Sequence, residues 1–106
     1  MINYRKINEY LDNKEKLEYS KLIDYTKISS DLNNDKIKEL CKDAETNNFY
    51  SVCVFPEYIA TAKSFLDNVK ISALIDFPKG ESDVKQKIST IDESFINGAD
   101  EIDVVV

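Results

Sequence analysis

The 106-residue sequence contains no histidine and only two cysteines, two glycines and two prolines. Without histidine the chain cannot form a Ser-His-Asp triad, a histidine general base or the usual histidine-containing zinc sites. Cys41 and Cys53 are too few for a disulfide framework, and their apolar surroundings are typical of reduced, buried thiols. The scarcity of glycine and proline leaves little room for linkers. We therefore expect one domain over residues 1–106, with no metal and no cofactor.

Long hydrophobic runs and clusters of basic residues are missing as well. No apolar run approaches the ~18 residues of a membrane span, and the polar start of the chain lacks the hydrophobic segment of a signal peptide. The net charge of -6 repels nucleic-acid phosphates and anionic lipids, and the 14 basic residues alternate with acidic ones. We therefore expect a cytoplasmic protein that binds neither nucleic acid nor membrane.

The sequence does contain an alternation of helical patterns and short apolar runs. An amphipathic helix is predicted within residues 1–20, and strands are predicted at residues 22–26, 51–55, 70–77 and 101–106. The expected core positions of the three connecting helices are Ile37, Leu40, Cys41 and Ala44, then Ile59, Ala62, Phe65 and Leu66, then Val84, Ile88, Ile91 and Phe95. Asn33 and Ser82 are expected as N-caps, Pro56 in a first turn and Gly98 at a C′ position.

Strands that alternate with helices predict right-handed βαβ units and a parallel sheet. Four strands are compatible with two architectures. One is a small open sheet with helices on both faces, and the other is half of a (β/α)₈ barrel with helices on one face only. The residue pattern alone leaves both open.

Three strand residues are candidates for a functional site. A carboxylate on a buried strand is unfavourable unless a cation or hydrogen-bond donors meet it. Asp103 is therefore expected to be functional or paired, because strand residues come after it, whereas Asp24 could equally bind loop amides at a strand end. Cys53 lies between Val52 and Val54 and is by default a small buried hydrophobic residue.

A lysine that forms a Schiff base must be desolvated in a pocket. Lys63, Lys85 and Lys87 are expected on solvated helix faces, where such chemistry is disfavoured. Lys27 and Lys79 come after strands, at the edge where barrels place their active sites, and are the remaining candidates.

Five segments, LIDYT (22–26), KIKELCKDA (36–44), YSVCVFPEYIATA (50–62), ISALIDFPKG (71–80) and NGADEIDVVV (97–106), resemble the deoxyribose-phosphate aldolases in order and spacing. The resemblance implies the first four strands of a TIM barrel, that is, an α/β fold. It also implies a class I aldolase that reversibly cleaves 2-deoxyribose 5-phosphate into acetaldehyde and glyceraldehyde 3-phosphate through a lysine Schiff base. Asp103 would correspond to the carboxylate that shuttles protons with two lysines, Cys53 to a cysteine near the substrate pocket, and Asp24 to the aspartate of the first strand.

The sequence departs from the family because it ends on the fourth strand. The Schiff-base lysine of the family lies on the sixth strand and its partner lysine on the seventh, so we expect these 106 residues to be inactive alone. Asp76 also stands where members often have Gly or Asn, and Tyr25 where many have His or Leu.

Three hypotheses remain. The favoured one is an inactive half-barrel that completes itself as a homodimer or higher even oligomer, by association or domain swapping, because its first and last strands are unprotected edges. The second is one subunit of a split aldolase whose other chain carries the missing half. The third is a small sugar-phosphate binding module.

Overall fold

The computed structural model describes residues 19–26 and 32–106. The elements are arranged along the chain in the order β1 (Asp24–Thr26), α3 (Asn34–Thr46), β2 (Ser51–Val54), η1 (Pro56–Tyr58), α4 (Ile59–Phe65), β3 (Lys70–Ile75), α5 (Val84–Ile96) and β4 (Glu101–Val104). Most of the helix predicted within residues 1–20, and Lys27, lie outside the described residues. In the described ranges no helix is long and apolar enough to cross a membrane.

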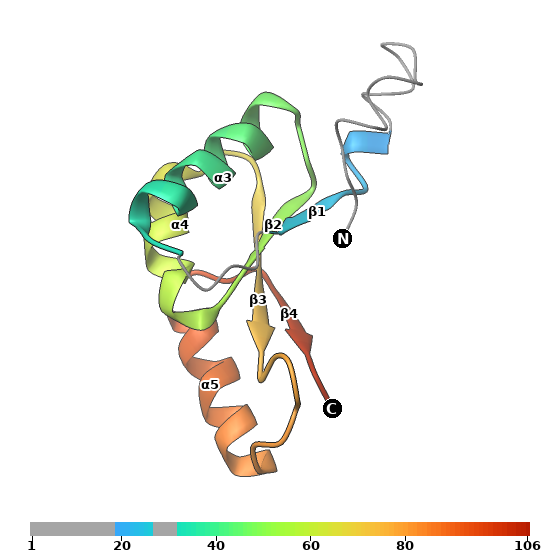
Figure 1. Ribbon diagram of the computed structural model, residues 1–106, viewed down its shortest axis with the longest axis vertical. Coiled ribbons are helices and arrows are strands. Elements are labelled where there is room, and N and C mark those ends of the chain that lie inside the picture. The colour runs from blue at the N-terminus through green and yellow to red at the C-terminus, as the bar shows by residue number, and fades with distance from the viewer. Residues whose placement is uncertain (1–18, 27–31) are drawn as a thin grey trace.

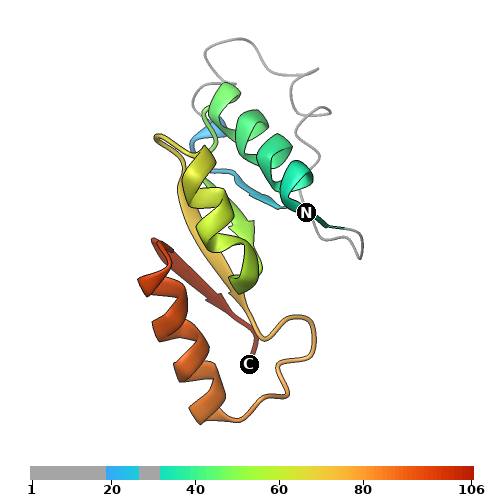
Figure 2. The ribbon, with the colours of Figure 1, turned by 90° about the vertical axis from the view of Figure 1, so that its left-hand side faces the viewer.

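The four strands form one parallel sheet in the order β1-β2-β3-β4. Helices α3, α4 and α5 lie in sequence order along one face of this sheet (Figures 1 and 2). The strand side chains on that face form the core together with the helices: Val52, Val54, Ile71, Ala73 and Ile75 are buried, and Ile102 and Val104 pack against them. Sequential strand order with helices on one face matches the barrel alternative and not the open two-sided sheet.

Helix α3 forms as the sequence predicts. The side chain of Asn33 accepts a hydrogen bond from the Lys36 amide at 3.0 Å, and a cap of this kind stabilises a helix by ~1 kcal/mol. The helix ends at Thr46 with Asn47 as its C-cap, next to the predicted stop, and Asn48 then takes a φ of 53°. The predicted core positions are all buried: Ile37, Leu40, Cys41 and Ala44.

The other predicted boundaries shift by one to three residues. Leu22 is 77% exposed and precedes β1, because the chain is still turning there. β2 ends at Val54, so that Phe55 precedes the first turn that Pro56 opens. Phe65, predicted in the core of α4, is instead 41% exposed at the end of this short helix.

Helix α5 differs from the prediction at its start and along its apolar stripe. Its N-cap is Asp83, which accepts from the Gln86 amide at 2.8 Å, and Ser82 is not the cap. Gly98 occupies the C′ position with a φ of 115°, as predicted. The residue that α5 buries is Ser94. The predicted core residues Val84, Ile88 and Phe95 are exposed, and Ile91 is half-buried.

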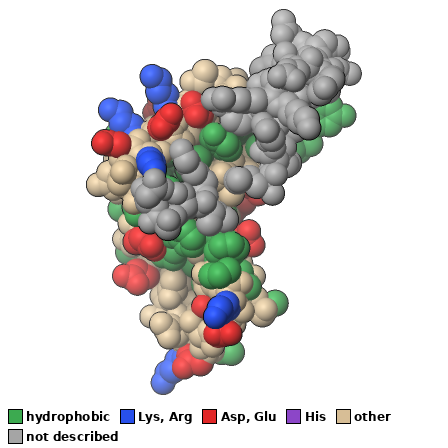
Figure 3. Space-filling view, in the orientation of Figure 1, with side chains coloured by type: hydrophobic (Ala, Val, Ile, Leu, Met, Phe, Trp, Pro, Cys, Tyr) green, Lys and Arg blue, Asp and Glu red, His purple; other side chains and the backbone are tan. Residues whose placement is uncertain are grey.

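Acidic and basic side chains are interspersed over the face of the molecule shown in Figure 3. Basic side chains form no cluster among the residues drawn in colour on this face.

Candidate functional site

The face of the sheet opposite the helices carries most of the polar strand residues. Strand alternation places Asp24 and Thr26 of β1, Ser51 and Cys53 of β2, Ser72 and Leu74 of β3, and Glu101 and Asp103 of β4 on this face, which we call the open face. The register brings Thr26, Cys53 and Ser72 side by side. Leu74 is the neighbour of Asp103. The three residues predicted as candidates therefore share one face.

The Cys53 thiol is surrounded by polar groups of the open face. The residue is 8% exposed. Burial raises the pKa of Cys53, hydrogen bonding with Thr26 and Ser72 lowers it, and the charges of Asp103 and Asp24 raise it further, with a net upward shift. The thiol therefore stays protonated at neutral pH and is a poor nucleophile. This agrees with the prediction of a buried, unactivated cysteine.

Both carboxylates predicted on buried strands are exposed, and that part of the prediction is wrong. The physical reason is the same for both, because Asp24 and Asp103 lie on the two outer strands of the described sheet. The Ser51 hydroxyl donates a hydrogen bond to the Asp24 carboxylate. Asp103 extends from the open face of β4, with its charge close enough to raise the Cys53 pKa.

Sequence reasoning missed the neighbours that complete this face. Thr26 donates to the backbone oxygen of Cys53 at 2.7 Å, so it also ties β1 to β2. Tyr50, just before β2, donates to the Glu101 carboxylate, and this bond, followed by burial and nearby acidic charges, raises the Tyr50 pKa. Alternate residues of a strand face the same side of the sheet. This rule could have placed Thr26 and Ser72 on the face of Cys53 only if the strand register had been known.

The lysines provide no desolvated amine on the open face among the described residues. Lys63, Lys79 and Lys85 are exposed. Strand alternation places Lys70 on the open face, at the N-terminal end of β3, where it is exposed. None of these four amines is desolvated in a pocket.

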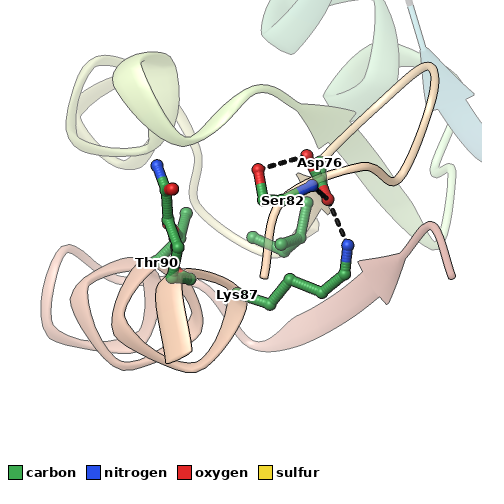
Figure 4. Close-up of a pocket in the computed structure, with 6 residues that line it drawn as sticks. Asp76, Ser82, Lys87 and Thr90 are labelled. Carbon is green, nitrogen blue, oxygen red and sulfur yellow. Dashed lines mark hydrogen bonds and ion pairs between the residues drawn. The ribbon is translucent and has the colours of Figure 1, made fainter. Parts of the chain in front are cut away.

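Lys87, expected in solvent, is instead an internal ion-pair partner. Its ammonium contacts the Asp76 carboxylate and donates to the Gly80 carbonyl at 2.7 Å, and its side chain is 14% exposed (Figure 4). The bond from Lys87 lowers the Asp76 pKa, and bonds from the Ser82 hydroxyl and amide add to this effect. Asp76, Ser82 and Lys87 line a cavity of about 200 Å³ together with Ile75, Gln86 and Thr90.

Metal chemistry has no evident site in the described part of the chain. Residues 19–26 and 32–106 contain no group of three or more His, Cys, Asp or Glu side chains placed to hold a metal ion. The chemistry open to this face is proton transfer by exposed carboxylates, with hydroxyl and thiol donors beside them.

The family model of the DeoC/LacD family aldolases matches residues 11–106. The deoxyribose-phosphate aldolase of Coprothermobacter proteolyticus is 40% identical over 92 residues, which cover 85% of this chain and 42% of the relative. The deoxyribose-phosphate aldolase of Mycoplasmoides gallisepticum is 41% identical over 92 residues, with 85% and 41% covered. The chain thus spans about two fifths of the length of these relatives.

Solved structures show the same relationship. A crystal structure from Coccidioides immitis, described as a deoxyribose-phosphate aldolase, matches with a TM-score of 0.78 at 30% identity, covering 82% of this chain and 35% of that one. The deoxyribose-phosphate aldolase of Aeropyrum pernix matches in fold, with a TM-score of 0.76 at 24% identity and coverages of 84% and 39%. The four strands and their helices therefore match part of a deoxyribose-phosphate aldolase barrel. The chain belongs to the DeoC/LacD family of aldolases.

Proposed function

We propose that this chain supplies part of the active site of an aldolase that interconverts 2-deoxyribose 5-phosphate with acetaldehyde and glyceraldehyde 3-phosphate. The observation that carries the proposal is the position of Asp103. It projects from the open face of a family sheet, at the position that the sequence resemblance assigns to the proton-shuttling carboxylate. An exposed carboxylate can accept and return a proton during aldol cleavage.

Other residues of the open face suit this role. Cys53 and Ser72 offer neutral donors on the same face. Because the Cys53 pKa is raised, its thiol does not compete with a lysine for the aldehyde carbon. Asp24 lies on β1, at the opposite side of the open face from Asp103, and its carboxylate accepts a hydrogen bond from the Ser51 hydroxyl. There it would border the pocket without touching the reacting carbon.

We propose further that the 106 residues do not catalyse the reaction alone. An imine requires a neutral amine, and the described lysines that reach the open face or its edges are solvated. In the proposed enzyme the Schiff-base lysine comes from the remaining strands of the barrel. Without that lysine Asp103 has no imine to deprotonate.

Complementation tests both proposals. The 106-residue chain is co-expressed with the part of the Coprothermobacter proteolyticus relative that lies beyond its matched stretch, and cleavage of 2-deoxyribose 5-phosphate is measured. We expect turnover from the pair and none from the chain alone. Asp103→Asn in the pair should lower kcat by about a hundredfold or more, as loss of a proton-transfer group does.

The matched control removes a different carboxylate from the same strand and the same face. Glu101→Gln keeps the hydrogen-bonding shape beside Tyr50 and should leave kcat within about tenfold. Turnover by the 106 residues alone, or an Asp103→Asn pair as fast as the unmodified pair, would refute the proposal.

A further inference from the structure

Lys87 closes the loop that joins β3 to α5, residues 76–83. Its ammonium contacts the Asp76 carboxylate (Figure 4) and donates to the Gly80 carbonyl at 2.7 Å. The Gly80 amide in turn donates to the Asp76 carbonyl at 2.8 Å. The Ser82 hydroxyl and amide donate to the Asp76 carboxylate at 2.8 and 2.9 Å. One ammonium on α5 therefore holds both the beginning and the middle of the loop.

At Gly80 this loop meets the end of β4. A Cβ atom added to Gly80 would come within 2.9 Å of the Val105 side chain and 3.0 Å of the Val105 carbonyl oxygen, so the two backbones approach closely. The Val105 amide also donates to the Ile75 carbonyl at 3.0 Å. Val105 is thus held between the end of β3 and the loop, two residues after Asp103.

The position of the Asp103 carboxylate depends on how the end of β4 is held. Among the described strands, β4 is an outer strand that pairs with β3, and Asp103 is the neighbour of Leu74 in that pair. A strand end with a single neighbour opens locally unless further contacts hold it. The contact between Gly80 and Val105 is such a contact, and it comes directly after the strand.

We infer that Lys87 is a positioning residue for Asp103: by binding Asp76 and Gly80 together, it keeps the loop against Val105 and fixes the end of β4. The inference rests on the proposed function for what Asp103 does there. The family resemblance places Gly or Asn in many members where this chain has Asp76, and neither carries the charge that pairs with Lys87. The device therefore distinguishes this chain from those members.

Hydrogen exchange at the two ends of the contact between β3 and β4 tests the inference. The Asp100 amide donates to the Ile71 carbonyl at 2.8 Å before β4 begins, and the Val105 amide donates to Ile75 after it ends. We expect Lys87→Met to speed exchange at Val105 by about tenfold or more, because hydrogen bonds from a charged group are lost. Exchange at Asp100 should change less than about twofold.

Two further variants separate the ion pair from other effects of the substitution. Lys87→Arg should restore slow exchange at Val105, because a guanidinium can donate to both the carboxylate and the carbonyl, and the adjoining cavity of about 200 Å³ leaves room for it. Lys85→Met removes an exposed lysine from the same helix and should leave exchange at Val105 unchanged.

Alkylation of Cys53 reports where the Asp103 carboxylate lies. Burial is the largest cause of the raised Cys53 pKa, and the charge of Asp103 adds to it. Asp103→Asn should therefore speed the reaction of Cys53 with iodoacetamide at pH 8 by about two- to fivefold. In the Lys87→Met chain the same substitution should speed it less than about 1.5-fold, because the carboxylate is no longer held near the thiol. Lys87→Arg should recover the full effect.

Equal acceleration of exchange at Val105 and Asp100 in Lys87→Met, or acceleration at neither, would overturn the positioning role. An effect of Asp103→Asn on Cys53 that is the same with and without Lys87 would overturn it as well. Neither readout involves aldolase turnover. A complemented pair in which Asp103→Asn is as fast as the unmodified pair would therefore contradict the proposed function and leave the positioning of β4 standing.

Discussion

The two cysteines are buried in different surroundings. Cys41 packs between α3 and α4, and burial, with the Glu45 charge, raises its pKa to about 11. Cys53 lies on the open face, where its raised pKa depends in part on the charges of Asp103 and Asp24. The Cys53 thiol therefore reports on the proposed site, and Cys41 serves as an internal reference.

Asp103→Asn should speed the alkylation of Cys53. Removing the negative charge lowers the thiol pKa and raises the thiolate fraction at pH 8, and because burial remains the larger cause, we expect an increase of about two- to fivefold. Mass spectrometry of iodoacetamide-treated peptides measures both cysteines. The Cys41 rate should not change. An unchanged Cys53 rate would contradict the placement of Asp103, and a parallel rise at Cys41 would indicate unfolding.

At the scale of elements, the loop between β3 and α5 depends on the Asp76 and Lys87 pair. The Asp76 pKa is lowered mainly by Lys87, so the pair contributes stability that is fully present above the unfolded pKa of ~3.9 and is lost as pH falls through the folded value. Lys87→Met should therefore lower the urea midpoint at pH 7. The difference from the unmodified chain should shrink as pH falls below about 4.

Lys85→Met is the control for this experiment, because Lys85 is exposed on the same helix two residues earlier. It should leave the urea midpoint unchanged at every pH. A Lys87→Met deficit that stays constant from pH 7 to pH 3 would mean that the hydrogen bond from Lys87 to the Gly80 carbonyl stabilises the loop, and not the ion pair with Asp76.

The sequence predicted α3 best because its cap, core spacing and end are all local signals. Asn33 and the four buried residues need no distant partner to be recognised. The apolar positions of α5, which are Val84, Ile88, Ile91 and Phe95, recur as regularly, but three of them are exposed and Ile91 is half-buried. Periodicity identifies an apolar face and does not identify what covers it.

The site was predicted in part. Asp24, Cys53 and Asp103 do share one face, but the exposure of the two carboxylates was not predicted, since it depends on β1 and β4 being the outer strands. Lys87 was missed because the Asp76 backbone, at a φ of 60°, reverses the chain after β3 and brings the carboxylate to α5. No periodic signal encodes such a turn.

At the scale of the whole molecule, both outer strands have a free edge in the described sheet. We propose that the chain alone forms a homodimer, or a higher even oligomer, through β1 and β4, because unpaired edges recruit strands.

A proline on the free edge of β4 tests this assembly. The Val105 amide donates to the Ile75 carbonyl of β3 at 3.0 Å. Because successive amides of a strand point to opposite sides, the Val104 amide points to the free edge. Val104→Pro should shift the assembly toward monomer by at least about tenfold in dissociation constant. Light scattering across a dilution series measures this, and a fully monomeric unmodified chain would contradict it.

The proposed division of the active site can be tested by asking which polypeptide carries the Schiff base. The complemented pair is incubated with 2-deoxyribose 5-phosphate and borohydride, which reduces an imine to a stable amine, and each polypeptide is then weighed by intact mass spectrometry. We predict a reduced adduct on the complementing fragment and none on this chain, whether paired or alone. A stoichiometric adduct on a lysine of this chain, such as Lys70 or Lys79, would contradict the proposal that the reactive lysine comes from the rest of the barrel.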